Sequence, residues 1–143
     1  SDGAAALVMM SRIEAERCNS KPLAKVVAHA TNSHDPAWFT TAPIGAIKKV
    51  LDKANWNIKD VGLFEINEAF AVVPMAAMKD LNLSPEIVNV HGGACALGHP
   101  VGTSGARIIA TLISAMHKYD VQKGIASLCI GGGEATAIAI EKN

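Results

Sequence analysis

Short apolar runs of strand length alternate along this chain with segments whose apolar residues recur at helical spacing. Such alternation indicates helices lying against a sheet, because each element must bury its apolar face on a neighbour. The last two strand-like runs, Gly124–Ile130 and Ala135–Ile140, are joined by the glycine run Gly131–Gly133, which predicts an antiparallel pair. The pattern therefore predicts an α/β fold: a mixed sheet covered by helices on both faces and ending in an antiparallel pair.

The expected elements follow from apolar periodicity and from turn residues. Strands are predicted, besides the final pair, over Gly3–Met10, Leu23–Ala30, Val61–Ile66 and Ile87–Val90. Helices are predicted over Ser11–Arg17, Pro43–Ala54, Ala69–Leu81 and Arg107–Tyr119, the last preceded by a capped start at Thr103-Ser104-Gly105. Thr31–Thr41 is predicted to be a loop. Pro74 fits within its helix only if that helix begins late, with Pro74 in the first turn.

Composition limits the class of protein. The 143 residues make one domain, half of them hydrophobic, and 13 basic residues balance 13 acidic ones. Without a run of Lys or Arg, and with few aromatic residues, nucleic acid and membrane surfaces are not expected partners. Three scattered cysteines, Cys18, Cys95 and Cys129, favour a reducing compartment, and no zinc-ligand spacing occurs. We expect a cytoplasmic protein without a metal, a membrane span or a signal peptide.

The stretch Asn89–Gly105 is rich in glycine and polar residues and lies between apolar segments. Glycine lets the backbone approach a ligand closely, and Pro100 restricts both its own φ and the conformation of His99. His99 is therefore held by a stiff backbone between flexible neighbours and is a candidate functional residue. The alternative is a glycine-rich connection that carries a surface histidine.

Two further motifs follow strand-like runs. Asn67 begins Asn-Glu-Ala-Phe after one run, and Cys129 begins Cys-Ile-Gly-Gly-Gly at the end of another. Because ligand sites in α/β folds gather beyond the carboxyl ends of strands, Asn67, Cys129 and His99 are expected to converge at one edge of the sheet. His99 beside Cys129 would make a Cys/His pair, in which the cysteine is either nucleophile or base. The alternative for Cys129 is a buried strand cysteine.

The three motifs, in this order, resemble those of the carboxyl-terminal half of the thiolase family, and within it the acetyl-CoA acetyltransferases. The resemblance implies a carboxyl-terminal thiolase domain over residues 21–143, with residues 1–20 as the last strand and linking helix of the amino-terminal domain. It implies a homo-oligomeric enzyme of lipid metabolism that reversibly condenses two acetyl-CoA to acetoacetyl-CoA and CoA. CoA thioesters are then the substrates, and no cofactor is expected. The missing amino-terminal half would carry the nucleophilic cysteine, so this chain alone is expected to be inactive.

The resemblance also implies a role for each catalytic candidate. Cys129 matches the cysteine that exchanges the α-proton of the second thioester. His99 matches the histidine that activates the nucleophilic cysteine and donates to the thioester oxygen. Asn67 matches the asparagine that holds a water in that oxyanion hole. Gly131 matches the glycine whose N–H helps to form a second hole.

Around these residues, Ala69 and Phe70 match positions that line the path of the pantetheine arm. Glu68 is interpreted as a helix-start carboxylate that faces the positive end of the helix dipole. The chain departs from many thiolases at two places, with His91 where they have Asn and Cys95 where they have an aliphatic residue. We expect His91 either to support a residue of the site or to be structural, and Cys95 to serve packing.

Two other classes of function stay open. A Cys/His acyltransferase or hydrolase with Cys129 as nucleophile would form a covalent acyl adduct on this chain by itself. A non-catalytic assembly module would keep the shape of the motifs but tolerate substitution of His99 and Cys129.

Overall fold

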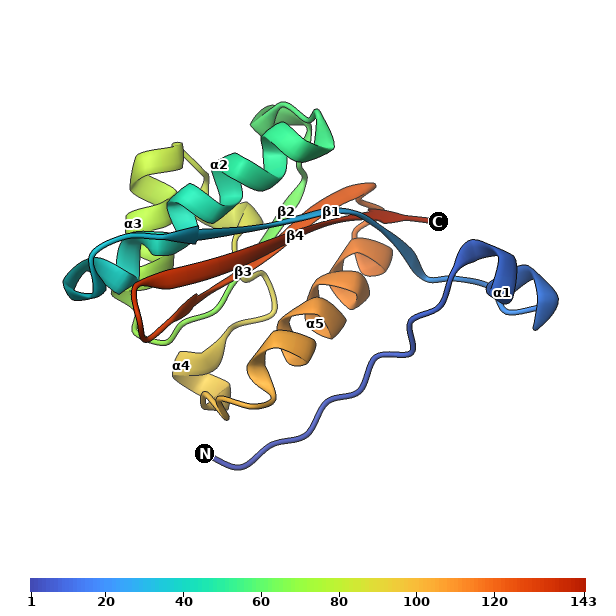
Figure 1. The fold of residues 1–143 in the computed structure, drawn as a ribbon, viewed down its shortest axis with the longest axis horizontal. Helices are drawn as coiled ribbons and strands as arrows, with labels where there is room; N and C mark the ends of the chain where they lie inside the picture. Colours follow the sequence, from blue (N-terminus) through green and yellow to red (C-terminus); the bar gives the residue numbers. More distant parts are fainter.

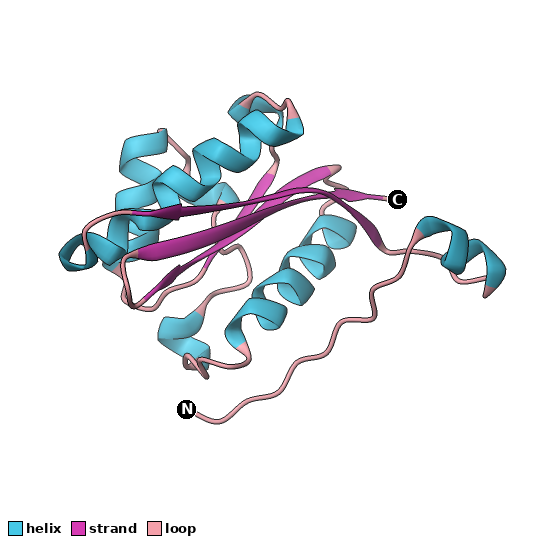
Figure 2. Cartoon of the chain, in the orientation of Figure 1, coloured by secondary structure: helices cyan, strands magenta, loops and turns pink.

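The computed structural model describes all residues from Ser1 to Asn143 and contains one four-stranded sheet with helices on both faces (Figures 1 and 2). The strands are β1 Ala24–Ser33, β2 Leu63–Ile66, β3 Lys123–Ile130 and β4 Glu134–Lys142. Their spatial order is β1-β4-β3-β2, in which β2 is parallel to β3 and the other neighbours are antiparallel. The predicted mixed sheet and its antiparallel end are confirmed.

Three longer helices cover the sheet, as the sequence predicts. Helices α2 (Ala42–Ala54) and α3 (Val72–Leu81) lie on one face, and α5 (Ser104–Lys118) lies on the other (Figure 1). The shorter elements are α1 (Arg12–Arg17), α4 (Ala94–Leu97) and three 3₁₀ turns, η1 (Pro36–Thr41), η2 (Ile58–Asp60) and η3 (Pro85–Ile87).

Each face of the sheet has its own apolar cluster, because side chains alternate along a strand. The cluster under α2 and α3, here called the upper core, includes Phe64, Ile66 and Ile125. The cluster under α5, here called the lower core, includes Leu63 and Ala126 together with Ile108, Leu112 and Met116 of the helix. The same strands β2 and β3 therefore divide their residues between two cores.

The boundaries of α3 show how backbone chemistry sets the helix. It begins at Val72 and not at the predicted Ala69, so Pro74 lies in the first turn, where its missing N–H has no helical partner to lose. The helix ends at Leu81, and the next residue, Asn82, adopts a left-handed conformation with φ of 52°. The late start leaves Asn67–Ala71 as a loop beyond β2.

Two predicted strands are wrong. Gly3–Met10 runs extended beside α5 without pairing in the sheet, and it is anchored by the Thr103 hydroxyl, which donates to the Gly3 carbonyl (Figure 1). Ile87–Val90 is also no strand, because only Val88 makes a single parallel bridge to Phe64. A strand needs a neighbour for its backbone groups, and neither segment has one over its length.

Elsewhere the predicted loop Thr31–Thr41 is mostly ordered structure. Strand β1 continues to Ser33, because β4 offers pairing partners as far as Glu134, and Pro36–Thr41 forms the turn η1. The Asp35 side chain accepts the Ala37 N–H at 2.9 Å and so starts that turn.

The turn between β3 and β4 depends on one glycine. Gly133 has φ of 93°, and a Cβ there would lie 2.3 Å from the backbone oxygen of His34. We expect Gly133→Ala to lower the free energy of unfolding by at least about 2 kcal/mol, because a strained φ and a backbone clash combine. Gly102→Ala is the control, since a methyl group at that position would have no atom within 4 Å. Equal urea midpoints for the two variants would contradict this account.

Candidate active site

The motifs after β2 and β3 meet at one edge of the sheet. Asn67 directly follows β2, and its backbone N–H donates to Ser127 of β3 at 2.9 Å. Cys129 lies two residues further along β3. Because the two strands are parallel, both motifs lie at the same carboxyl edge, as expected from the sequence.

His99 joins this edge through a loop and not through a third strand. It lies between α4 and α5, and its Nδ1 is 2.6 Å from Ser104 Oγ. The Ser104 hydroxyl donates in turn to the Pro100 carbonyl at 3.1 Å, so Oγ is left to accept from His99 Nδ1–H. This arrangement leaves the proton-free nitrogen of a neutral His99 at Nε2.

The start of α5 differs from the predicted cap. The helix begins at Ser104, within the stretch predicted to start it and three residues before the predicted Arg107, but Thr103 makes no side-chain hydrogen bond to the helix. Its hydroxyl reaches Gly3, and the Ser104 hydroxyl is used by His99 and Pro100. The polar residues at this helix start therefore orient the imidazole instead of capping the helix.

Asn67 and His99 are in direct contact. Asn67 Nδ2 lies 3.4 Å from Nε2 and 3.5 Å from Nδ1 of His99, nearly equidistant from the two ring nitrogens. The asparagine is 1% exposed, whereas the imidazole remains half-buried. An amide N–H and an imidazole nitrogen at this spacing can both hydrogen-bond to the same small polar group.

Cys129 faces the other side of the strand. It is 7% exposed and belongs to the upper core, and no hydrogen bond joins it to His99. The predicted Cys/His pair is therefore not formed in this chain, because alternation along β3 directs Cys129 toward α2 and α3. Burial raises the pKa of the Cys129 thiol above its ordinary value.

The remaining predicted positions lie around this edge. Gly131 is in the β3–β4 turn, and the space where its side chain would be is open. Ala69 packs against the upper core, while Phe70 is 59% exposed and meets Phe39 edge-on, with ring centroids 6.2 Å apart. Phe70 thus presents an aromatic surface beside the site.

Glu68 does not start a helix, so its predicted role at the helix dipole is wrong. Its carboxylate accepts the Asn89 side-chain N–H at 3.0 Å and the Cys95 backbone N–H at 2.8 Å. Burial acts to raise the pKa of Glu68, but the hydrogen bonds from Cys95 and Asn89 outweigh it and lower the pKa. Gly93 leaves room for this carboxylate, because a Cβ there would lie within 2.7 Å of it.

Two departures from the thiolase pattern lie at the surface. The Cys95 side chain is exposed, so the expected packing role is wrong. The contact that Cys95 makes with the site is through its backbone N–H, which donates to the Glu68 carboxylate. His91 is exposed beside Tyr119, with ring centroids 5.6 Å apart.

Sequence reasoning missed a buried ion pair next to Asn67. Arg107 Nη1 of α5 lies 3.0 Å from the Glu65 carboxylate, which is 2% exposed, and Arg107 Nη2 lies 3.4 Å from Asn67 Oδ1. Burial raises the pKa of Glu65 to about 7, although the Arg107 charge and hydrogen bond act to lower it. The available signal was one carboxylate within the apolar run Val61–Ile66, where a charge without a partner is costly.

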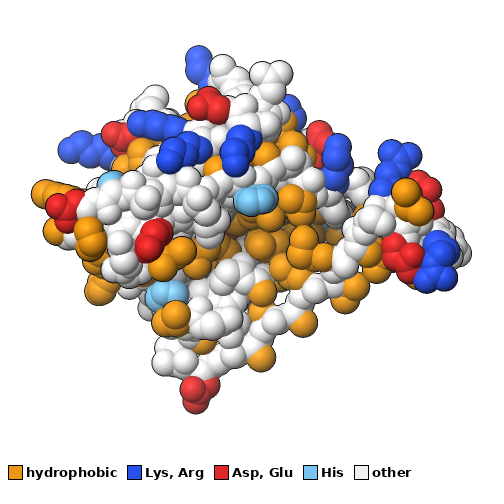
Figure 3. Space-filling model, in the orientation of Figure 1, with side chains coloured by type: hydrophobic (Ala, Val, Ile, Leu, Met, Phe, Trp, Pro, Cys, Tyr) orange, Lys and Arg blue, Asp and Glu red, His pale blue; other side chains and the backbone are white.

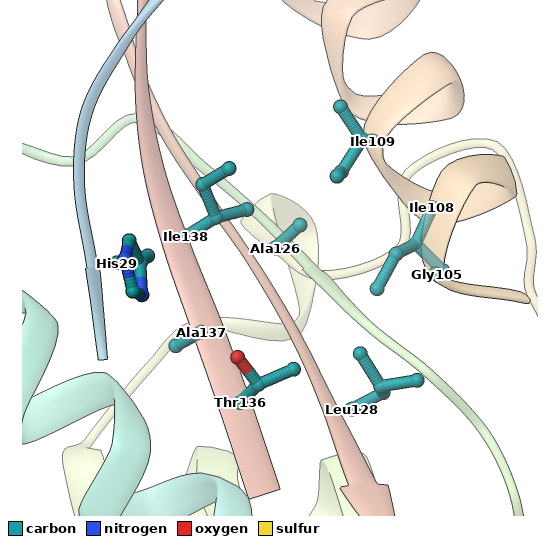
Figure 4. A pocket seen from close by; sticks show the side chains of 9 residues that line it. All are labelled: His29, Gly105, Ile108, Ile109, Ala126, Leu128, Thr136, Ala137 and Ile138. Atoms are coloured by element: carbon teal, nitrogen blue, oxygen red, sulfur yellow. The ribbon is translucent and has the colours of Figure 1, made fainter. Parts of the chain in front are cut away.

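A shallow apolar hollow of about 190 Å³ lies on the α5 face, and none of the predicted catalytic residues lines it. Figure 4 shows its lining, with Ile108 and Ile109 of α5 opposite Leu128 and Ile138 of the sheet. In Figure 3, hydrophobic side chains gather on the surface between the sheet and the chain's N-terminal segment. No group of three or more metal-binding side chains occurs, and no helix has the length and apolarity needed to cross a bilayer.

Comparisons with known proteins agree with this geometry. Residues 20–142 match the family model described as "Thiolase, C-terminal domain". The chain is 49% identical over 141 residues to mouse cytosolic acetyl-CoA acetyltransferase, a match that covers 99% of this chain and 36% of that protein.

Solved structures give the same result. The Bacillus anthracis acetyl-CoA acetyltransferase superposes with a TM-score of 0.91 at 43% identity, covering 94% of this chain and 34% of that one. A thiolase from Ascaris suum, in complex with coenzyme A, has a TM-score of 0.88 at 47% identity over 93% of this chain and 34% of that one. The chain thus spans about a third of the length of the proteins it matches.

The buried Glu65 carboxylate gives a prediction about stability. Because its pKa is raised to about 7, the folded state holds the proton more tightly than the unfolded state does. The tighter binding of this proton adds to the free energy of unfolding. The added stability is complete below the ordinary carboxyl pKa and is lost as the pH rises through about 7, a loss on the order of 3 kcal/mol. Glu65→Gln should lack this loss.

Urea unfolding of both proteins, from about pH 4.5 to about pH 8, measures the difference. Asp80→Asn is the matched control, since it removes an exposed carboxylate from the Lys48–Asp80 ion pair. Parallel stability curves for the original chain and Glu65→Gln would refute the assignment.

Proposed function

The chain belongs to the thiolase family as its carboxyl-terminal domain, and we propose on that premise that, with an amino-terminal thiolase half, it works as an acetyl-CoA acetyltransferase. The reaction is the reversible condensation of two acetyl-CoA to acetoacetyl-CoA and CoA. The observation that carries the proposal is the Asn67–His99 contact at the carboxyl edge of β2, with Cys129 at the end of the neighbouring β3.

His99 and Asn67 suit a site where charge develops on a thioester oxygen. Ser104 accepts from His99 Nδ1–H, so the opposite nitrogen Nε2 is free to take the proton of an incoming thiol. We assign this step to activation of the nucleophilic cysteine of the amino-terminal half. Once protonated, Nε2 donates to the thioester oxygen, while Asn67 holds a water at the same oxyanion.

Cys129 has a different task in this scheme. Its thiolate removes the α-proton of the second acetyl-CoA, and the resulting carbanion attacks the acetyl thioester on the nucleophilic cysteine. A carbon–carbon bond forms, the acetyl–sulfur bond breaks, and the nucleophilic cysteine leaves as thiolate. Burial raises the pKa of Cys129, which makes its thiolate scarcer but more basic toward a carbon acid. Gly131 contributes its N–H to the second oxyanion hole.

The substrate surface is proposed around Ala69 and Phe70. Exposed Phe70 offers an aromatic wall to the pantetheine arm, and the Ascaris suum thiolase structure, in complex with coenzyme A, supports CoA as the shared group. CoA thioesters are substrates in this proposal, and the chemistry uses thiol, imidazole and amide groups without a cofactor or metal.

The amino-terminal half is the proposed partner on the α5 face. The apolar hollow beside α5 and the exposed apolar side chains Val8 and Met9, in the segment that runs beside α5, support a covered surface there (Figure 3). We further propose a cytoplasmic enzyme of lipid metabolism that assembles as a homo-oligomer. No nucleic-acid or membrane partner is proposed.

Substitutions at Cys129 and His99 should separate the two half-reactions of the full-length protein. Cys129→Ala should still acylate the nucleophilic cysteine from acetyl-CoA but fail to condense. His99→Ala should slow both halves, by on the order of 10²–10³ where one oxyanion donor is lost. Single-turnover labelling followed by product analysis measures both steps. Cys18→Ala and His117→Ala are controls at exposed positions outside the site, and a folded Cys129→Ala that cannot be acylated would contradict its role.

The 143-residue chain by itself should make no acetoacetyl-CoA. It has His99, Asn67 and Cys129 but, in this proposal, not the cysteine that carries the acyl group, so the reaction cannot be divided into two steps. Incubation with acetyl-CoA, followed by product analysis and intact mass, checks this. A stable acetyl group on Cys129 would instead support the Cys/His acyltransferase or hydrolase. Turnover on adding an amino-terminal thiolase half would support the proposal.

A further inference from the structure

The role proposed for Asn67 requires its amide to face one way. A carboxamide has an accepting oxygen and a donating nitrogen of nearly equal size, so the partners of each end decide its orientation. With Nδ2 toward His99, the amide can donate at the site. Turned over, its oxygen could only accept a hydrogen bond from the water that Asn67 is proposed to hold, and the amide could no longer donate to that water. Some group must therefore hold the amide in the productive orientation.

Arg107 is placed to do this. Its guanidinium has donors only, and Nη2 lies 3.4 Å from one end of the Asn67 amide. That end must be the accepting oxygen, so the donating Nδ2 is directed at His99, where it lies 3.4 Å from Nε2. A single contact with a long, flexible side chain would give a weak constraint, however.

The guanidinium is itself held by a buried carboxylate. Arg107 Nη1 lies 3.0 Å from Glu65 Oε1, and the arginine side chain is largely buried between α5 and the sheet. The planar fork of arginine spans both partners at once, which an ammonium point charge does not do in the same fixed geometry. Because Glu65 lies on β2, only two positions before Asn67, β2 and the residue directly after it present the carboxylate that holds Arg107 and the amide that Arg107 orients.

A buried ion pair is a weak source of net stability, since desolvation offsets most of the attraction. The Glu65–Arg107 pair instead fixes the position of the guanidinium beside Asn67. We propose that Arg107, anchored by Glu65, is the positioning residue that fixes the Asn67 amide with its N–H toward His99. This inference rests on the proposed function for its catalytic meaning, but the orientation itself can be measured in this chain alone.

The charged groups that face Glu65 are Arg107 from α5 and the Glu68 carboxylate beyond β2, and these act in opposite directions on its protonation. Because the pKa of Glu65 is raised to about 7, the carboxylate gains its proton in an accessible pH range. The Asn67 amide should sense that change through Arg107, which offers a spectroscopic readout of the connection.

The first experiment observes the Asn67 side-chain amide by NMR in the asparagine-labelled chain, with Asn67→Ala used to assign the signal. Arg107→Met should raise the exchange of the two amide protons with water about five- to tenfold, the effect of one lost hydrogen bond. Arg107→Lys should do the same. It keeps a positive charge beside Glu65, and so the fold, but replaces the fork by a single ammonium.

In a His99→Gln background, where the imidazole that contacts the amide is absent, the Asn67 amide nitrogen shift should titrate with a midpoint of about 7, and Glu65→Gln should abolish this titration. Asp80→Asn is the matched control, because it breaks an exposed ion pair on the opposite face and should change neither readout. Unchanged amide exchange in Arg107→Lys, or a titration that survives Glu65→Gln, would overturn the proposal.

The second experiment measures acetoacetyl-CoA thiolysis in the full-length protein. Arg107→Lys should lower kcat by roughly 10- to 100-fold while KM stays within about twofold, since a misaligned group affects the transition state more than binding. An unsubstituted protein without thiolysis would refute the proposed function while the NMR result stood. Normal kcat in Arg107→Lys, with the amide released, would overturn the catalytic part of this inference.

Discussion

Parallel pairing between β2 and β3 is the constraint on which the site depends. It places two strand ends at one edge of the sheet, so Asn67 and Cys129 become neighbours although about sixty residues separate them in the chain. The backbone bond from Asn67 to Ser127 continues this register one step beyond β2. A shift of one residue would turn Glu65 and Asn67 away from α5 and toward the upper core. The register therefore decides which face receives the polar residues.

The outer side of β2 shows how a side chain can replace a strand. Asn89 has a left-handed backbone, and its side-chain amide accepts from the Ile66 N–H at 2.7 Å and donates to the Ile66 carbonyl at 2.8 Å. The same amide nitrogen lies 3.0 Å from Glu68, which also holds the Cys95 N–H. The glycine-rich loop is thereby tied to the end of β2, and this tie brings His99 to the site without a further strand.

Alternation along the strands separates the polar chemistry into two environments. Glu65 and Asn67 face α5, where Arg107, Ser104 and His99 meet them. Cys129 faces the upper core, where burial raises its pKa. In the proposed reaction, Cys129 exchanges the α-proton of the substrate from the upper-core face, while the polar network of the site lies on the α5 face. The turn at Gly131, directly beyond β3, leaves open space beside Cys129's end of the strand.

Local patterns in the sequence determined the helices, the mixed sheet, the antiparallel end and the strand ends at Asn67 and Cys129, because periodicity and turn chemistry act over a few residues. They could not determine which of the other strand-like segments would find a partner. Gly3–Met10 and Ile87–Val90 have strand-like composition but lack a neighbour, and Ser33 is in a strand only because β4 reaches Glu134. The ion pair of Glu65 with Arg107, the Glu68 contacts and the outward Cys95 likewise exist only in the tertiary structure. Each joins residues that are distant in the chain, and a buried charge can be interpreted only when its partner is known.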